Sequence, residues 1–300
     1  MTELERIARI RRSAGRARGM TLGIGDDCAI YQPKPGEELL FTTDMLIEGV
    51  HFLRETHSPA DIGHKALARG LSDIAAMGGT PKFCLLSLAV PADTTDRWLD
   101  SFYKGLLDLA KRTQAPLAGG DLAHSDKINC DIIVCGSTPT GTALRRSGAK
   151  PGDHIYVTGM LGGSALGLAT RKGAAWKRHL RPEPRLKIGA ILREKFHATA
   201  CMDLSDGLSI DLHRLCLESK VSADLDGDLP AFPGASMDQF LHGGEDYELL
   251  FTVMKSVELP GQISGVPITR IGAIRKGSPG AITLDEFSIL PMGYDHFRKP

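Results

Sequence analysis

Short runs of apolar and β-branched residues alternate along this chain with longer segments whose apolar residues recur at helical spacing, and glycine-rich turns separate them. This alternation predicts an α+β fold, because apolar strands and amphipathic helices bury their faces against one another. The strands are expected at residues 38–44, 130–136, 154–159, 201–203 and 248–253, and the helices at about 4–10, 58–77, 98–109, from 164 onward and 184–197.

The length of 300 residues suggests either two domains or one large domain. The stretch from Thr138 to Asp153 is dense in glycine, proline, threonine and serine, which is typical of a connection. We therefore predict two α/β domains, at residues 1–138 and 139–300.

Charge and cysteine content exclude several classes of protein. The 36 basic and 36 acidic residues give no net charge, so we expect no general nucleic-acid binding. The longest apolar run, near Cys84–Val90, is far shorter than the ~20 residues of a membrane-spanning helix, so we expect no membrane partner. The six cysteines include no C-x-x-C pair, which indicates reduced thiols and a cytoplasmic protein.

The usual nucleotide and hydrolase motifs are missing. The chain has no Gly-Lys dipeptide and hence no Walker A loop, and neither H-E-x-x-H nor G-x-S-x-G occurs. The segment TGMLGGSALGL at 158–168 follows a predicted strand, but its spacing does not match G-x-G-x-x-G. We interpret it as a glycine turn before a packed helix.

Acidic residues beside glycines or at predicted strand ends are the main chemical signal. Each has a structural alternative: Asp206 could cap a helix, Asp121 could close a turn, and Asp73 could pair with Arg69 on a helix surface. Carboxylates that meet without cations repel one another, and Mg²⁺ relieves this by taking oxygen ligands from carboxylates and phosphates. The pattern therefore suggests a magnesium–phosphate site built from Asp26, Asp27, Asp44, Asp73, Asp121, Asp203, Asp206, Glu245 and Asp246.

Candidate phosphate and substrate contacts accompany these acids. Arg145 and Arg146 precede SGAKPGD, and arginine can grip a phosphate with two N–H groups, although a solvated surface pair is the alternative. His51 in GVHF is either a ligand contact or a buried histidine with its own partners.

Eight motifs occur in an order that resembles the thiamine-monophosphate kinase family, within the aminoimidazole ribonucleotide synthase superfamily. They are GIGDDCA, FTTDMLIEGVHF, KALARGLSDIAAMGG, AGGD, RRSGAKPGD, DLSDGL, HGGEDYELLF and GYDHF. Gly-Gly-Asp is shared across the superfamily, whereas GIGDD, TTD…GVHF, GGEDYEL and GYDHF together indicate the thiamine-phosphate branch.

The resemblance implies a fold and a reaction. An N-terminal α/β domain would pair its strands with a second subunit in a barrel-like core of a homodimer, and ATP would lie between it and the C-terminal domain. With Mg²⁺, ATP and thiamine monophosphate would give thiamine diphosphate and ADP. The acceptor is a phosphate monoester that is mostly deprotonated at neutral pH, so direct in-line transfer needs no strong base. An aspartyl-phosphate intermediate stays an open alternative.

The resemblance also implies roles for individual residues. Metal positions are Asp27, Thr42, Thr43, Asp44, Asp73, Asp121, Asp203 and Asp206. Nucleotide contacts are Tyr103, Gly120, Asp121, Ser205 and Arg146, with Arg145 as the alternative to Arg146. Substrate contacts are His51, Glu245 and a C-terminal aromatic, either Tyr294 or Phe297, and the candidate catalytic residues are Asp44, Asp121 and Arg146.

Two other functions compete with this hypothesis. One is another ATP-dependent enzyme of the superfamily, such as the ring-closing aminoimidazole ribonucleotide synthase, which acts on a formylglycinamidine ribonucleotide. The other is a nucleotide-binding protein that kept the fold without catalysis.

Overall fold

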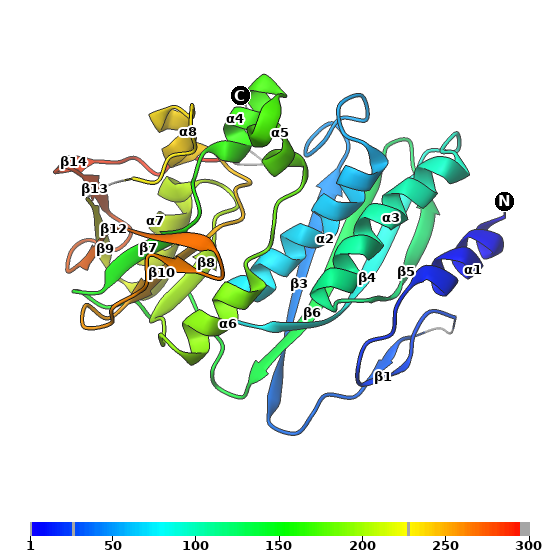
Figure 1. The fold of residues 1–300 in the computed structure, drawn as a ribbon, viewed down its shortest axis with the longest axis horizontal. Helices are drawn as coiled ribbons and strands as arrows, with labels where there is room; N and C mark the ends of the chain where they lie inside the picture. The colour runs from blue at the N-terminus through cyan, green and yellow to red at the C-terminus, as the bar shows by residue number, and fades with distance from the viewer. Residues whose placement is uncertain (1, 26–27, 227–228, 295–300) are drawn as a thin grey trace. The chain divides into compact units, whose positions relative to one another are not determined.

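The computed structural model describes residues 2–25, 28–226 and 229–294. The chain forms two compact units, one of Met1–Ile74 with Gly79–Gly141 and one of Ala75–Gly78 with Thr142–Pro300. Each unit combines helices with its own sheet (Figure 1). The expected α+β class is therefore confirmed.

The first unit is a four-stranded sheet with two long helices on one face (Figure 1). Its elements are α1 (Glu3–Ser13), β1 (Met20–Leu22), β2 (Ile30–Tyr31), β3 (Glu37–Ile47), α2 (Pro59–Ala76), β4 (Thr80–Val90), α3 (Asp96–Thr113), β5 (Leu117–His124) and β6 (Asn129–Pro139). The sheet order is β3-β6-β4-β5, with β4 and β5 parallel and the other pairs antiparallel. Strands β1 and β2 form a separate pair.

Alternation along the strands separates a covered face from an open one. Cys130, Ile132 and Val134 of β6 are fully buried, and α2 packs so closely there that a Cβ on Gly70 would meet the Val134 side chain at 2.6 Å. On β3, by contrast, Phe41 and Met45 are 64% and 52% exposed. Since successive side chains of a strand point to opposite faces, the helices cover one side of the sheet. On the other side, Cys135 packs against Ala17 and Met20, while Phe41 and Met45 stay exposed.

Local capping explains where the helices begin. Thr2 and Glu5 form a reciprocal capping box at α1, and the Thr95 side chain accepts the Trp98 N–H at α3. At α2 the Ser58 hydroxyl accepts the Asp61 N–H at 3.2 Å. The sequence predictions of these helices are confirmed.

Helices α2 and α3 cross with their main chains in contact. A Cβ on Gly63 would lie 2.1 Å from the Phe102 carbonyl oxygen, and one on Gly105 would lie 1.9 Å from that of Ala60. Both distances are far below any van der Waals contact, so glycine is required at these positions for the observed spacing of the two helices.

Strand β3 is longer than the sequence pattern indicated. The prediction ended it at Asp44, but pairing with β6 continues to Ile47, which lies opposite Asn129. Met45, Leu46 and Ile47 prolong the alternation of exposed and buried positions. Asp44 therefore lies inside the strand and does not end it.

The second unit is a larger, mostly antiparallel sheet. Its elements are β7 (His154–Thr158), α4 (Gly163–Thr170), α5 (Gly173–Leu180), α6 (Leu186–Glu194), β8 (Ala200–Asp203), α7 (Leu208–Ser219), β9 (Ser222–Leu225), α8 (Met237–His242), β10 (Leu249–Val253), β11 (Gln262–Ile263), β12 (Val266–Arg275), β13 (Ile282–Leu284) and β14 (Phe287–Ser288). The sheet order is β14-β13-β9-β12-β7-β10-β8, with β11 paired to β12.

Two apolar clusters lie on the two faces of this sheet. Leu250 of β10 packs in the cluster that includes Leu212 and Leu215 of α7, and Phe251 packs in the cluster that includes Leu192 of α6. Neighbouring residues of β10 therefore pack against helices on opposite faces of the sheet, as expected for a sheet that is covered on both sides. Within the described ranges, no helix is long and apolar enough to cross a membrane.

Candidate functional site

Three of the predicted metal-site residues gather where β3 faces α2. The Thr42 hydroxyl donates to the Asp73 carboxylate at 2.5 Å, and Asp44 pairs with Arg69 at 2.5 Å. Thr42 and Asp44 share a face of β3 because they are two residues apart, and Arg69 and Asp73 share a face of α2 because they are four apart. Arg69 and Asp73 of α2 thus both contact β3.

The other two described metal-site residues of this unit lie on the opposite face of the sheet. Thr43 donates to Asp131 at 2.7 Å. Asp121 lies opposite Ser87 of β4, which in turn lies opposite Asp131 of β6, so these three side chains share one face of the sheet. Asp44 lies opposite Ile132, the next residue of β6, and therefore points to the face that the helices cover. The alternative that Asp121 closes a turn was wrong, since it lies within β5.

Gly120 is explained by packing against its neighbouring strand. Its φ is +150°, and a Cβ there would lie 1.9 Å from the Leu86 carbonyl oxygen. The close approach that glycine permits at Gly120 is therefore to β4.

His51 closes the turn that follows β3. Its ring atom Nδ1 accepts the Ile47 backbone N–H at 3.0 Å, and the His51 backbone N–H donates to the Ile47 carbonyl at 2.9 Å. His51 is half-buried, so part of its surface stays accessible. Asp26, Asp27 and Phe297 lie outside the described residues.

Tyr103 lies on the wall of a hollow of about 1200 Å³ within the first unit. Its phenol is almost fully buried, and this burial raises its pKa. The basic lining residues are Arg6, Arg9, Arg16, Arg18, Lys34, Lys82, Lys104 and Lys111, against the acidic Asp100 and Asp108. An aromatic wall with a cationic surround suits a ligand that has a ring and phosphates. Gly120 and Asp121, both described, are not in this lining.

In the second unit, three distant segments are joined by backbone hydrogen bonds. The Glu245 N–H donates to the Ser205 carbonyl at 2.8 Å, and the Tyr294 N–H donates to that of Asp206 at 3.1 Å. Asp203 ends the adjoining strand β8 and is 4% exposed. The predicted residues Asp203, Ser205, Asp206, Glu245 and Tyr294 therefore belong to one group of neighbouring loops.

Asp211, which sequence reasoning missed, shapes the turn that carries Ser205 and Asp206. One of its carboxylate oxygens accepts the N–H groups of Ser205, Asp206 and Gly207 at 3.1, 3.0 and 3.1 Å. Burial raises its pKa to about 6. Arg214 bridges Asp206 at 2.5 Å and Asp211 at 2.9 Å. A signal was present, since Asp211 stands in the first turn of a helix without a capping side chain.

The expectation that Asp206 caps this helix was wrong. The N-cap of α7 is Gly207, with φ +126° and no side-chain cap, and a Cβ there would lie 2.8 Å from the His242 carbonyl. The Asp206 carboxylate instead pairs with Arg214 and keeps about a quarter of its surface exposed.

The basic pair before SGAKPGD has its main chain fixed and its side chains exposed. The Arg145 carbonyl accepts the Cys201 N–H at 3.0 Å, and the Arg146 carbonyl accepts the Ser219 hydroxyl at 2.6 Å. Arg145 also lines a hollow of about 640 Å³ together with Arg193 and His197.

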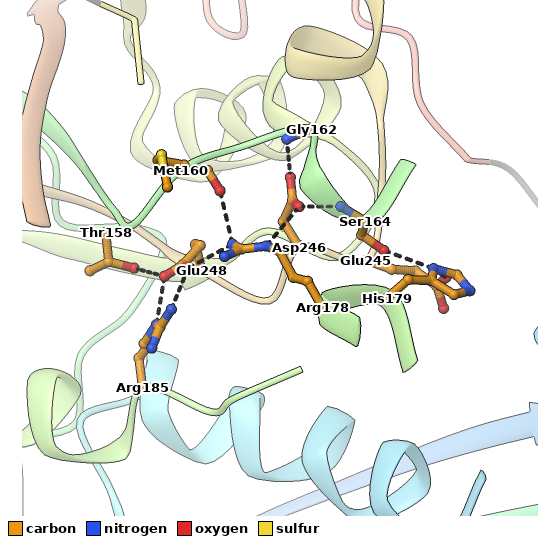
Figure 2. A network of polar contacts seen from close by, with 10 residues as sticks. All are labelled: Thr158, Met160, Gly162, Ser164, Arg178, His179, Arg185, Glu245, Asp246 and Glu248. Atoms are coloured by element: carbon orange, nitrogen blue, oxygen red, sulfur yellow. Dashed lines mark hydrogen bonds and ion pairs between the residues drawn. The ribbon is translucent and has the colours of Figure 1, made fainter. Parts of the chain in front are cut away.

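A buried polar network adjoins Glu245 and includes the acids Asp246 and Glu248 (Figure 2). Glu248 is fully buried and accepts hydrogen bonds from Arg185 at 2.5 and 2.6 Å, from Arg178 at 2.7 Å and from Thr158 at 2.5 Å. Asp246 accepts the Gly162 N–H at 2.5 Å, and burial raises its pKa. Asp246 was predicted among the ligand acids, whereas Glu248, Arg178 and Arg185 were not among the predicted site residues.

In the ranges 2–25, 28–226 and 229–294, no group of three or more histidine, cysteine or acidic side chains is arranged to hold a metal ion. The acids contact hydroxyls and arginines instead, as Asp73 contacts Thr42 and as Asp206 and Asp211 contact Arg214. Magnesium is commonly held by one or two carboxylates, with phosphate and water oxygens completing its octahedron, so oxygen donors of this kind are chemically suitable.

Comparison with known proteins adds to this geometry. The families described as AIR synthase related protein, N-terminal domain, and AIR synthase related protein, C-terminal domain, match residues 25–140 and 150–266. Thiamine-monophosphate kinase of Escherichia coli strain K12 is 41% identical, with 93% of each chain covered. The chain belongs to the thiamine-monophosphate kinase family.

Solved structures agree with this membership. Thiamine-monophosphate kinase from Stenotrophomonas maltophilia K279a superposes with a TM-score of 0.83 at 34% identity, over 98% of each chain. The structure of AaThiL complexed with AMPPCP and TMP superposes with a TM-score of 0.79 at 32% identity, over 89% of each chain. The resemblance stated from the eight motifs is thus confirmed for the family.

Proposed function

We propose that this chain transfers the γ-phosphoryl group of ATP to thiamine monophosphate, giving thiamine diphosphate and ADP. The strongest support for this function is the 41% identity to the Escherichia coli thiamine-monophosphate kinase over 93% of both chains. The AaThiL complex supports both substrates, because AMPPCP differs from ATP only by a methylene in place of the β,γ-bridging oxygen.

The reaction we propose is a single in-line displacement. An oxygen of the substrate phosphate forms a bond to the γ-phosphorus while the bond from that phosphorus to the bridging oxygen breaks, and ADP leaves with the electron pair. The attacking phosphate has a second pKa near ~6 and is already mostly deprotonated at neutral pH. The protein's task is therefore to bring two polyanions together and align them.

We assign the binding of Mg²⁺ to Asp27, Thr42, Thr43, Asp44, Asp73 and Asp121 in the N-terminal part, and to Asp203 and Asp206 in the C-terminal part. When bound, the ion would neutralise phosphate charge. The contact of Asp44 with Arg69 supports its role, since this half-buried carboxylate already has a cationic neighbour that a ligand could replace.

We assign nucleotide contacts to Tyr103, Gly120, Ser205 and Arg146 or Arg145, and substrate contacts to His51, Glu245 and Tyr294 or Phe297. The basic hollow beside Tyr103 supports the first assignment. The thiamine ring is cationic, and a carboxylate such as Glu245 next to an aromatic ring suits a cation. Residues 1–138 would then supply nucleotide, metal and dimer contacts, and residues 139–300 the rest of the substrate site.

One assay tests this function. Purified protein is incubated with ATP, Mg²⁺ and thiamine monophosphate, and thiamine diphosphate and ADP are measured by chromatography. Equal amounts of the two products are expected. ATP binding without ADP release would indicate a binding protein, and turnover of a formylglycinamidine ribonucleotide instead would indicate the ring-closing branch of the superfamily.

We also infer that the chain works as a cytoplasmic homodimer that pairs the open faces of two N-terminal sheets. Phe41 and Met45 expose large apolar surfaces on β3, and such faces are typical of interfaces. Light scattering should give a dimer for the native protein and a monomer for Phe41→Asp. Phe287→Asp is the control, because Phe287 is 79% exposed in the other unit. A monomeric native protein would contradict the inference.

A further inference from the structure

Glu245 has a backbone conformation that its own residue type does not favour. Its φ is +65°, and Tyr247, two residues on, has a φ of +50°. Left-handed conformations are unfavourable for residues other than glycine, so the surrounding structure has to stabilise them. The acids that flank Glu245 and Tyr247 supply the contacts.

Asp246 ties the segment to the start of α4. Its carboxylate accepts the N–H groups of Gly162 at 2.5 Å and Ser164 at 3.0 Å, and its side chain is 3% exposed. The next residue but one, Glu248, points into the same network and is fully buried. Asp246 and Glu248 therefore direct the loop inward, while the Glu245 side chain stays 24% exposed beside His179 (Figure 2).

Arg178 of α5 contacts both buried acids. Its Nη2 donates to Glu248 at 2.7 Å and to the Met160 carbonyl at 2.8 Å, and its Nε lies 3.4 Å from Asp246. Arg185 contacts Glu248 through two nitrogens, so Glu248 would keep a cation if Arg178 were lost. The orientation of Asp246, the immediate neighbour of Glu245, thus depends more on Arg178 than on Arg185.

The glycine turn before α4 makes room for this network. A Cβ on Gly159 would lie 2.1 Å from a carboxylate oxygen of Glu248, and one on Gly163 would lie 2.8 Å from Cδ of Arg178. The glycines of TGMLGG therefore adjoin protein side chains of the network. This agrees with the interpretation that the segment is not a dinucleotide fingerprint.

The α4–α5 pair also reaches Glu245 itself. His179, next to Arg178 on α5, lies with Nδ1 3.4 Å from the Glu245 carboxylate and 2.9 Å from the Ser164 hydroxyl. The Trp176 ring stacks on it with centroids 5.1 Å apart. One short helix thus contacts the backbone anchor of Glu245 through Arg178 and its side chain through His179.

We propose that Arg178 is a positioning residue that sets the direction of the Glu245 carboxylate toward the thiamine-phosphate substrate by joining Asp246 and Glu248. This rests on the proposed function, in which Glu245 contacts that substrate. Arg178 itself acts from behind the loop.

Steady-state kinetics of Arg178→Gln test the proposal. The expected result is a rise of about 10-fold or more in KM for thiamine monophosphate, with KM for ATP changed less than about 2-fold. Arg178→Lys keeps the positive charge but lacks the planar guanidinium group. It should therefore be more stable than Arg178→Gln, while its KM for thiamine monophosphate stays raised. It also serves as the test variant if Arg178→Gln does not fold.

Two comparisons separate positioning from a structural role. Lys177→Gln changes an exposed residue of the same helix and should leave both KM values unchanged. Arg185→Gln should lower the melting temperature with a smaller change in KM for thiamine monophosphate. Folded Arg178 variants with unchanged KM values, or with both KM values raised equally, would overturn the proposal. A native protein that forms no thiamine diphosphate would instead refute the proposed function on which it rests.

Discussion

Asp44 in the first unit and Glu248 in the second show two ways of holding a carboxylate. Asp44 pairs with Arg69 and keeps 21% of its side chain exposed, whereas Glu248 is fully buried among Arg178, Arg185 and Thr158. A partly exposed acid can exchange its protein cation for a ligand, but a buried one with several hydrogen bonds cannot do so without loss of structure. An acid-rich motif such as HGGEDYE can therefore contain more structural acids than ligand acids.

The largest expected effect is on the stability of the second unit. Glu248→Ala leaves the charges of Arg178 and Arg185 without their shared partner, so the free energy of unfolding should fall by about 3–5 kcal/mol. Denaturant unfolding followed by circular dichroism measures this. Glu194→Ala removes a 63% exposed acid, and its partner Arg193 keeps hydrogen bonds to Gly78 and Thr142, so the loss should be less than about 1 kcal/mol. Equal losses for the two variants would end the distinction between buried and exposed acids.

A smaller effect, on activity alone, is expected in the first unit. Asp44→Asn removes a charge directed at the proposed metal–phosphate site, so turnover should fall at least ~100-fold, about 2.7 kcal/mol in activation free energy. The melting temperature should stay close to that of the native protein. Asp93→Asn, in the exposed turn before α3, is the control. Native turnover of Asp44→Asn at saturating Mg²⁺ would show that Asp44 is a structural acid too.

The smallest expected difference between the two units is in how the stability contributed by one acid of each unit changes with pH. Burial raises the pKa of Asp246 above its ordinary value of 3.8, so the folded protein holds this proton to higher pH than the unfolded chain does. The stabilisation it contributes is present below that value and is lost as pH rises through the raised pKa. The stability of the native protein minus that of Asp246→Asn should therefore decrease as pH rises from about 4.

Glu48 of the first unit should behave in the opposite way. A hydrogen bond from Arg54 lowers the pKa of Glu48 below 4.5, so its stabilisation is present above that value and is lost as pH falls through the lowered one. The stability difference between native protein and Glu48→Gln should grow with rising pH. Urea unfolding at several pH values checks both variants, and slopes of the same sign would contradict the comparison.

Local patterns predicted the elements with long periodic segments or clear caps. The helix α2, with Ser58 before Pro59, is an example. The helices α5 and α8 were missed because α5 has no side-chain cap and α8 is only six residues long, too short for a helical period to appear.

The acids of the candidate site could be found from their glycine neighbours, but their partners could not. Glu248 is separated from Arg185 by 63 residues and from Arg178 by 70, so no spacing in the sequence relates them. The pairing of Thr42 with Asp73 likewise depends on how α2 lies on the sheet. Tertiary packing, which leaves no local signal, therefore decides which acids are structural.

The main-chain crossing at Gly63 and Gly105 limits how this family member can be altered. A single methyl group at either glycine would push α2 away from α3, because each added carbon would meet a carbonyl oxygen. Since α2 carries Asp73 and Arg69, that movement would shift the side chains that contact β3. Replacing helical glycines with alanine is a common way to raise heat resistance, because alanine has the higher helix propensity. Such changes should spare Gly63 and Gly105, since either one would displace Asp73 and Arg69 from their contacts with β3.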